Sequence, residues 1–239
     1  MSEASWTMKK VIFSLLLYLA VSCVLHAQDS VRPVFASVLR PFVYPSDISM
    51  TGKILLFGKE WLKGKLLTPN NTVISNDSFL FNFDKIDKRL LATRDFNNIF
   101  EIDWREFKAV LFYWHDTGFV FKHIYPISNK DLFQVLINGN EKYSLYKTVH
   151  AKVVKEYYFN VGASSKVPEK YQDLPEYCIL FPNRDYRIIH STKRAAIERV
   201  FSLDPDYLKV NEYLNTTAKS VYDEEDLKKL IYFLNKENL

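Results

Sequence analysis

Short apolar runs fill the middle of the chain, and turn sequences separate them. Between residues 53 and 190 these runs recur about every eight to twelve residues, the spacing typical of successive antiparallel strands. Asp116-Thr117-Gly118 and Asn138-Gly139-Asn140 supply residues that tolerate the positive φ angles of tight hairpins. The pattern therefore predicts a mainly β fold, an antiparallel meander arranged as a sandwich or a partly open barrel. The expected strands cover residues 53–57, 61–67, 78–83, 90–93, 99–103, 107–115, 119–125, 132–137, 143–149, 153–159, 177–181 and 186–190.

Alternation with a period of two identifies one buried face of this sheet. In residues 78–83 the phenylalanines fall on one side and Asn82 on the other, and Glu101 and Asp103 face outward from the next aromatic strand. Such an aromatic inner face either fills a core or lines a cavity that holds one apolar ligand. The candidate ligand-binding face consists of Phe79, Phe81, Phe83, Phe100, Trp104, Phe119 and Phe121.

Two stretches break this alternation. Residues 109–114 are apolar throughout, which predicts a central strand covered on both faces. Residues 161–176 contain Gly162, Pro168 and Pro175 and have no apolar period, which predicts a long surface loop at one end of the sheet.

The period becomes helical from Ser191 onward, and three short C-terminal helices are expected. Ser191 or Thr192 can cap the first, and Asp204 followed by Pro205 is a typical start for the second. Asp223 is the expected cap of the third, whose buried stripe would be Leu227, Leu230, Ile231 and Leu234. Because short helices gain most of their stability from packing, we expect residues 191–239 to pack on a β domain formed by 28–190.

The beginning of the chain has the pattern of an export signal. Lys9 and Lys10 precede an apolar run that is shorter than the roughly 20 residues a membrane-spanning helix needs, and the small residue Ala27 follows it. We expect translation to start at Met8 and a signal peptide spanning residues 1–27 to be cleaved after Ala27. The mature chain would then have no transmembrane segment and would be secreted or periplasmic. Two alternatives stay open, a lipid anchor on Cys23 or an uncleaved anchor.

Composition narrows the function classes. The chain has 239 residues, of which 15% are aromatic and only 6 are Gly, so it is globular rather than Gly-rich or disordered. Its Lys and Arg residues are scattered and the formal net charge is +4, too weak a bias to indicate a nucleic-acid partner. Cleavage after Ala27 would remove Cys23 and leave Cys178 without a disulfide partner. Cys178 lies in an apolar run, so we expect an inert buried thiol.

The chain contains no recognisable catalytic motif, so no catalytic residue and no cofactor is predicted. The sequence lacks a phosphate-binding loop, a dinucleotide fingerprint, a Gly-x-Ser-x-Gly elbow and a His-Glu-x-x-His helix. No metal-ligand set is predicted either, and the weak candidates are His115 and His123, on either side of a hairpin turn that contains Asp116.

Four stretches of the chain carry a resemblance to a known group of proteins. The leader MKKVIFSLLLYLAVSCVLHAQ, the segments FNFDKIDKRLL and NGNEKYSLYK, and the tail DEEDLKKLIYFLN together resemble uncharacterised secreted or periplasmic proteins of Bacteroidetes-type bacteria. The resemblance implies a bacterial envelope location and brings no activity or catalytic residue with it.

The sequence thus favours an exported cell-envelope protein that acts by binding and not by catalysis. Its expected partner is an apolar small molecule on the aromatic face or an envelope protein. One alternative is an interaction or scaffold module with a filled core, which predicts an exposed aromatic patch. A second alternative is an envelope hydrolase, which needs converging carboxylates or a histidine beside an acid.

Overall fold

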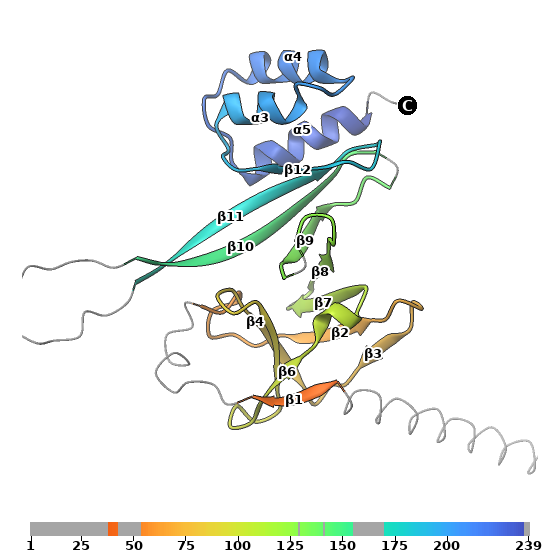
Figure 1. The fold of residues 1–239 in the computed structure, drawn as a ribbon, viewed down its shortest axis with the longest axis vertical. Coiled ribbons are helices and arrows are strands. Elements are labelled where there is room, and N and C mark those ends of the chain that lie inside the picture. Colours follow the sequence, from red (N-terminus) through yellow and green to blue (C-terminus); the bar gives the residue numbers. More distant parts are fainter. Residues whose placement is uncertain (1–37, 43–53, 129, 141, 155–169, 237–239) are drawn as a thin grey trace, which may run out of the picture.

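The computed structural model describes residues 38–42, 54–128, 130–140, 142–154 and 170–236 (Figure 1). Within these residues the chain forms twelve antiparallel strands in two sheets, the short 3-10 helix η1 (Trp104–Glu106) and three helices near the C-terminus. The mainly β prediction is confirmed, and of its two forms the sandwich-like one is observed, since the sheets are not closed into a barrel. The predicted leader with its cleavage site, and residues 155–159 of a predicted strand, lie outside the described residues.

The smaller sheet contains four strands, and three of them follow one another along the chain. β4 and β5 pair as a hairpin, β6 pairs with β5, and β1 pairs with the far side of β6. The sheet order is β1 (Leu39–Phe42), β6 (Ile99–Ile102), β5 (Arg89–Thr93) and β4 (Leu80–Asp84).

The larger sheet contains eight strands, and from β7 to β12 each strand pairs with the next one in the chain. Its order is β12 (Tyr186–Ile189), β11 (Lys170–Leu180), β10 (Ser144–Val154), β9 (Leu132–Ile137), β8 (Thr117–His123), β7 (Ala109–Trp114), β2 (Lys63–Leu67) and β3 (Val73–Ser75).

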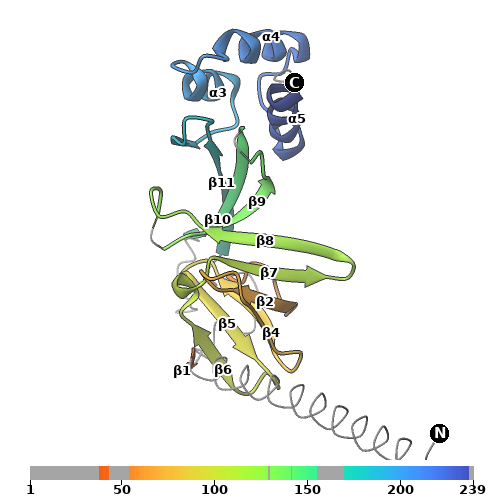
Figure 2. The ribbon, with the colours of Figure 1, turned by 90° about the vertical axis from the view of Figure 1, so that its right-hand side faces the viewer.

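Two lobes share this larger sheet (Figures 1 and 2). The N-terminal lobe comprises β1 to β8, and side chains of the smaller sheet and of β2, β7 and β8 form its hydrophobic core. The C-terminal lobe comprises β9 to β12 and three helices, which pack on β9 to β12 to form a second core. The helices are α3 (Arg194–Phe201), α4 (Tyr207–Thr217) and α5 (Glu224–Lys236).

A long hairpin, β10–β11, connects the lobes (Figure 1). It is paired along its whole length, from Ser144 opposite Leu180 to Val154 opposite Lys170. β9 and β12 pair only with the end of it that lies nearest the helices. The rest is a two-stranded segment that we call the ribbon, residues 148–154 and 170–176. It approaches the N-terminal lobe, where Tyr171 packs against the hydrophobic cluster that contains Leu91.

The ribbon corrects one sequence-based prediction. Residues 170–176 were expected to belong to an irregular loop, but they continue β11. Pro175 pairs with Val149 on one side only, and β12 does not reach it on the other. A proline is tolerated in an edge strand because its missing N–H faces away from the ladder.

Asn82 is a second departure, because the alternation predicts an exposed side chain and the structure buries it completely. Its Oδ1 accepts hydrogen bonds from the backbone N–H groups of Phe57 (3.3 Å) and Phe83 (2.8 Å). Its Nδ2 donates to the carbonyls of Gly58 (3.3 Å) and Glu60 (2.7 Å). The segment before β2 covers this side of β4, and the amide satisfies backbone groups there that would otherwise be buried without partners.

The helix predictions are confirmed for number and position, and in part for their caps. Asp223 caps α5 as predicted: its Oδ1 accepts from the N–H of Asp226 at 2.8 Å, and the Asp226 carboxylate accepts from the N–H of Asp223 at 3.1 Å. The predicted stripe on α5 is buried. Asp204, however, does not cap α4, which begins at Tyr207. The carboxylate of Asp204 instead accepts a hydrogen bond from the hydroxyl of Tyr143 at 2.6 Å.

Candidate functional site

The predicted aromatic face lies inside the core of the N-terminal lobe. Phe100 and Phe119 are half-buried, and the other five predicted members are buried. The rings contact one another: Phe79 and Phe100 have centroids 6.1 Å apart, and Phe83 lies 6.3 Å from Trp104. The seven predicted residues are therefore brought together, and their faces are occupied largely by other protein side chains.

Phe57 is a member of this cluster that the alternation did not identify. Its ring lies 5.1 Å from Phe112 and 6.2 Å from Phe121. Phe57 belongs to the irregular segment before β2, whose backbone is hydrogen-bonded to the side chain of Asn82. Residues 53–57 were predicted as a strand, but residues 54–57 form turns with one isolated bridge at Leu55. An apolar run without alternation does not indicate which of its side chains enters the core.

The two weak metal candidates are not brought together. His115 is exposed at the tip of the β7–β8 hairpin, and His123 ends β8 at the other end of the same strand. Because a strand rises about 3.3 Å per residue, the two lie roughly 20 Å apart. Among the described residues, no group of three or more His, Cys, Asp or Glu side chains is placed to hold a metal ion.

His123 is instead enclosed by aromatic rings. Its ring lies 5.0 Å from Trp104 and 4.1 Å from Tyr125, and neither of its nitrogens makes a hydrogen bond within the described residues. Burial lowers the pKa of His123, and the nearby backbone of Ser128 opposes that shift only in part. The neutral ring is therefore the favoured form.

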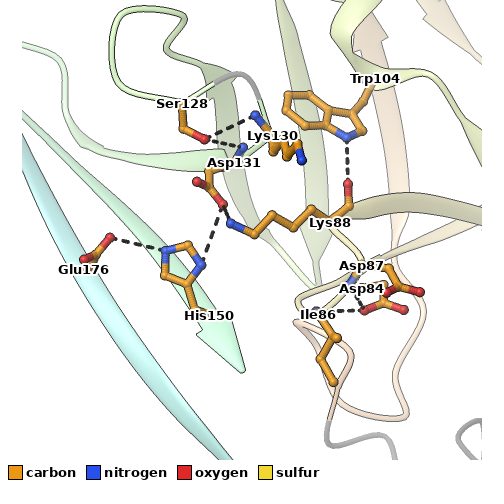
Figure 3. Close-up of polar contacts among 10 residues, drawn as sticks. All are labelled: Asp84, Ile86, Asp87, Lys88, Trp104, Ser128, Lys130, Asp131, His150 and Glu176. Atoms are coloured by element: carbon orange, nitrogen blue, oxygen red, sulfur yellow. Dashed lines mark hydrogen bonds and ion pairs between the residues drawn. The ribbon is translucent and has the colours of Figure 1, made fainter. Parts of the chain in front are cut away.

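A charged cluster joins the two lobes where the ribbon approaches β8 and β9 (Figure 3). Asp131, just before β9, pairs with the ammonium of Lys88 from the β4–β5 turn. His150 of β10 lies between two acids, with Nδ1 3.6 Å from Asp131 and Nε2 3.3 Å from Glu176 of β11. Burial alone would raise the pKa of Asp131, but hydrogen bonds from Lys88 and Ser128 outweigh it and the pKa lies below its usual value.

This cluster contains a histidine beside an acid, as the hydrolase alternative requires, but its geometry favours a structural role. A histidine that acts as a general base uses one ring nitrogen for an orienting acid and leaves the other for the reacting proton. Here the two acids lie on opposite sides of the His150 ring (Figure 3), so Nε2 is hydrogen-bonded to Glu176 and Nδ1 faces the carboxylate of Asp131. The arrangement connects the β4–β5 turn, the segment before β9 and the ribbon.

Cys178 behaves as a structural thiol. It is buried in a small cluster with Phe133 and Tyr146, and burial raises its pKa to about 12. A nucleophilic cysteine needs a lowered pKa, so this environment suppresses the thiolate.

The outer surface of the N-terminal lobe carries a feature that the sequence reading missed. Leu66, Val110, Phe112 and Phe121 point into the core, so the alternate residues of these strands point outward. These outward residues mix aliphatic and aromatic side chains with lysines, and none of them is acidic. We call this surface the outer face; it consists of Lys63, Lys65, Leu67, Val73, Leu111, Tyr113, Val120 and Lys122.

The strand register sets the pattern of the outer face. Lys65 lies between Ser75 and Leu111, with Val120 next in the row, and Lys63 pairs with Tyr113. The ammonium of Lys65 lies 5.4 Å from the centre of the Tyr113 ring. Residues 109–114 were expected to be covered on both faces, but Leu111 and Tyr113 stay half-exposed because none of the described elements packs over them.

Comparison with known proteins identifies no relative of this chain. No protein-family model, no curated protein sequence and no solved structure matches it. Among the described residues, no helix combines the length and the apolar character needed to cross a membrane.

Proposed function

We propose that this chain is a non-enzymatic protein of the cell envelope that binds a protein partner through its outer face. The observation that carries the proposal is the composition of that face, where half-buried aliphatic and aromatic side chains and the exposed Val73 lie among three lysines and no acid. The rings of the inner aromatic face pack against one another, which favours an interaction module over a carrier of an apolar ligand.

The chemistry of the outer face indicates what the partner should present. Burial of apolar surface supplies most of the binding free energy at an interface, while complementary charges guide orientation and choice of partner. A surface with Leu111, Tyr113 and Val120 at its centre and lysines around them suits a partner that carries carboxylates around an apolar patch. Val73, whose side chain is 51% exposed on the edge strand β3, extends the apolar part.

The envelope location rests on the leader and on the resemblance of the chain to exported proteins. We expect the protein isolated from the envelope fraction of its own host to begin at Gln28, directly after the predicted cleavage site. A Cys23-lipidated N-terminus would establish the lipoprotein alternative, and an intact N-terminus in the cytoplasm would contradict export.

Site-specific photo-crosslinking in the native host tests the binding surface. A photoreactive amino acid at Val120 should give one discrete crosslinked protein, and the same group at Glu212, exposed on α4, should not. Combining the probe with Lys63→Glu and Lys65→Glu should reduce the adduct at least tenfold, because these changes reverse the charge of the face. Lys59→Glu with Lys130→Glu is the matched control, since both lysines are exposed elsewhere and the net charge change is equal. Absence of an adduct from Val120, or equal loss in the control pair, would refute the proposal.

A further inference from the structure

A pocket lies at the end of the larger sheet that is nearest the helices. Two turns form its walls, the one between β9 and β10 and the one between β11 and β12. The two turns are neighbours because Ser144 pairs with Leu180, which in turn pairs with Tyr186. The cavity has a volume of about 640 Å³ and is lined by Asn138, Asn140, Lys142, Ser144, Leu180, Phe181, Pro182, Arg184 and Tyr186. That volume lies within the range of small-molecule sites, about 300–1,000 Å³.

Within the described residues, the pocket contains two positive charges that form no ion pair with an acid. The ammonium of Lys142 donates to the backbone carbonyl of Asn235 at 2.8 Å, which orients it but leaves its charge uncompensated. The guanidinium of Arg184 makes no ion pair or hydrogen bond within the described part of the chain. Most other arginine and lysine side chains near the helices are paired with acids, such as Arg187 with Asp185 and Lys147 with Glu224.

Hydrogen bonds to α5 and within the second turn fix the two turns that form the pocket. The side-chain amide of Asn235 on α5 accepts a hydrogen bond from the N–H of Tyr143 at 3.0 Å and donates one to the carbonyl of Tyr143 at 2.9 Å. These two bonds fix the first turn to the helix. In the second turn, the N–H of Phe181 donates to the backbone carbonyl of Asp185, and the N–H of Arg184 donates to the carbonyl of Phe181. A ligand that binds between such turns does not have to order them, so less of its binding free energy is lost.

We propose that this pocket binds a small acidic sugar, a saccharide unit that carries a carboxylate or a phosphate. Arg184 and Lys142 supply the charge that such an anion needs, and a guanidinium can donate two parallel hydrogen bonds to either group. The amides of Asn138 and Asn140 and the hydroxyl of Tyr186 provide hydrogen-bonding groups for sugar hydroxyls. Pro182 and Leu180 add apolar surface for the C–H face of a sugar ring. The site lies in the C-terminal lobe and the outer face in the N-terminal lobe, so the two proposals can fail separately.

Calorimetric titration of the mature protein at low salt tests the ligand class. D-glucuronate and glucose 6-phosphate are the charged probes, and glucose and inorganic phosphate separate the contribution of the sugar from that of the charge. We expect saturable binding of at least one charged sugar, with both glucose and inorganic phosphate at least tenfold weaker. Equal affinity for glucose would contradict the role of the cations, and equal affinity for phosphate would contradict a sugar site. A lack of binding of both charged sugars at millimolar concentration would overturn the proposal.

Variants locate the binding to this pocket. Arg184→Gln should weaken binding of the charged sugar at least tenfold. Arg184→Lys keeps the charge but loses the two parallel hydrogen-bond donors of the guanidinium, so it should have a smaller effect. Arg199→Gln is the matched control, because Arg199 is an exposed arginine on α3 outside the pocket. Unfolding midpoints of all variants should match that of the parent protein. Unchanged affinity in Arg184→Gln would place the binding elsewhere and refute the assignment.

Discussion

His123 is the residue whose environment most clearly departs from that of an exposed histidine. Its ring is enclosed by Trp104 and Tyr125, and its pKa is lowered by burial from the ordinary value of 6.5. The unfolded chain therefore takes up a proton at this position at a higher pH than the folded protein does. The free energy of unfolding should fall as pH decreases through about 6.5 towards the lowered pKa, where the loss levels off.

Replacement of His123 by Phe tests this contribution, because the aromatic contacts are kept and the titration is removed. We expect the parent protein to lose more stability than His123→Phe between pH 7.5 and pH 5.5. The difference should stay below about 1.4 kcal/mol, because pH 5.5 lies only about one pH unit below the ordinary pKa of 6.5. Urea unfolding at the two pH values measures it. Equal pH dependence in the two proteins would contradict the assignment, and His115→Phe, at the exposed hairpin tip, is the matched control.

At the scale of single elements, α5 combines a local signal with long-range contacts. Its N-terminus has the reciprocal Asp223–Asp226 cap, and its side chain Glu224 accepts a hydrogen bond from Lys147 of β10 at 2.6 Å. Burial would raise the pKa of Glu224, but the hydrogen bonds and charges of Lys147 and Lys228 outweigh it and lower the pKa. The helix is thus fixed both at its own N-terminus and to the sheet below it.

Removal of the cap should destabilise α5 without changing its packing. Asp223→Ala should lower stability by about 1 kcal/mol, the usual value for a lost N-cap, because the N–H of Asp226 loses its acceptor. Glu225→Ala removes an exposed acid from the same turn and should cost less than about 0.5 kcal/mol. Hydrogen exchange of the α5 amides, together with urea unfolding, separates a local effect from a global one. Equal effects of the two variants would argue against the cap.

The ease of prediction differs between elements for a physical reason. The α5 cap and stripe, the β4 phenylalanines and the turn at residues 138–140 are encoded by neighbours in the sequence, so periodicity and turn chemistry reveal them. Asn82, Phe57 and the outer face depend on which segment covers a strand, and that is decided by contacts with distant parts of the chain. The ribbon residues 170–176 were missed because their polar, proline-containing sequence resembles a loop until β10 pairs with them.

At the scale of the whole molecule, one ion pair connects the ribbon to the N-terminal lobe across 88 residues of sequence. The ammonium of Lys85 lies 2.5 Å from the carboxylate of Asp173, and the Lys85 side chain is only 3% exposed whereas that of Asp173 is 57% exposed. A buried cation without its partner is costly, while removal of both charges is close to neutral. The pair should therefore control how firmly the ribbon holds to the lobe.

A double-mutant cycle tests this connection. Asp173→Asn should destabilise the protein by about 1–3 kcal/mol, because it leaves the Lys85 charge buried without a carboxylate. Lys85→Met keeps the aliphatic stem and removes the charge, so Asp173→Asn should add little in that background. Urea unfolding measures all four proteins. Additive effects of the two substitutions would mean that the two side chains do not interact, and the ribbon would then be held by other contacts such as those of Tyr171 and His150.

The strand order of the larger sheet has a consequence for the way the chain acquires its structure. From β7 to β12 every new strand finds its pairing edge on the strand that precedes it in the chain. Assembly can therefore proceed by successive hairpins from the N-terminal lobe towards the helices, with a short loop to close at most steps. An order of this kind suits a polypeptide that emerges with its N-terminus first, since each segment meets its template as soon as it appears.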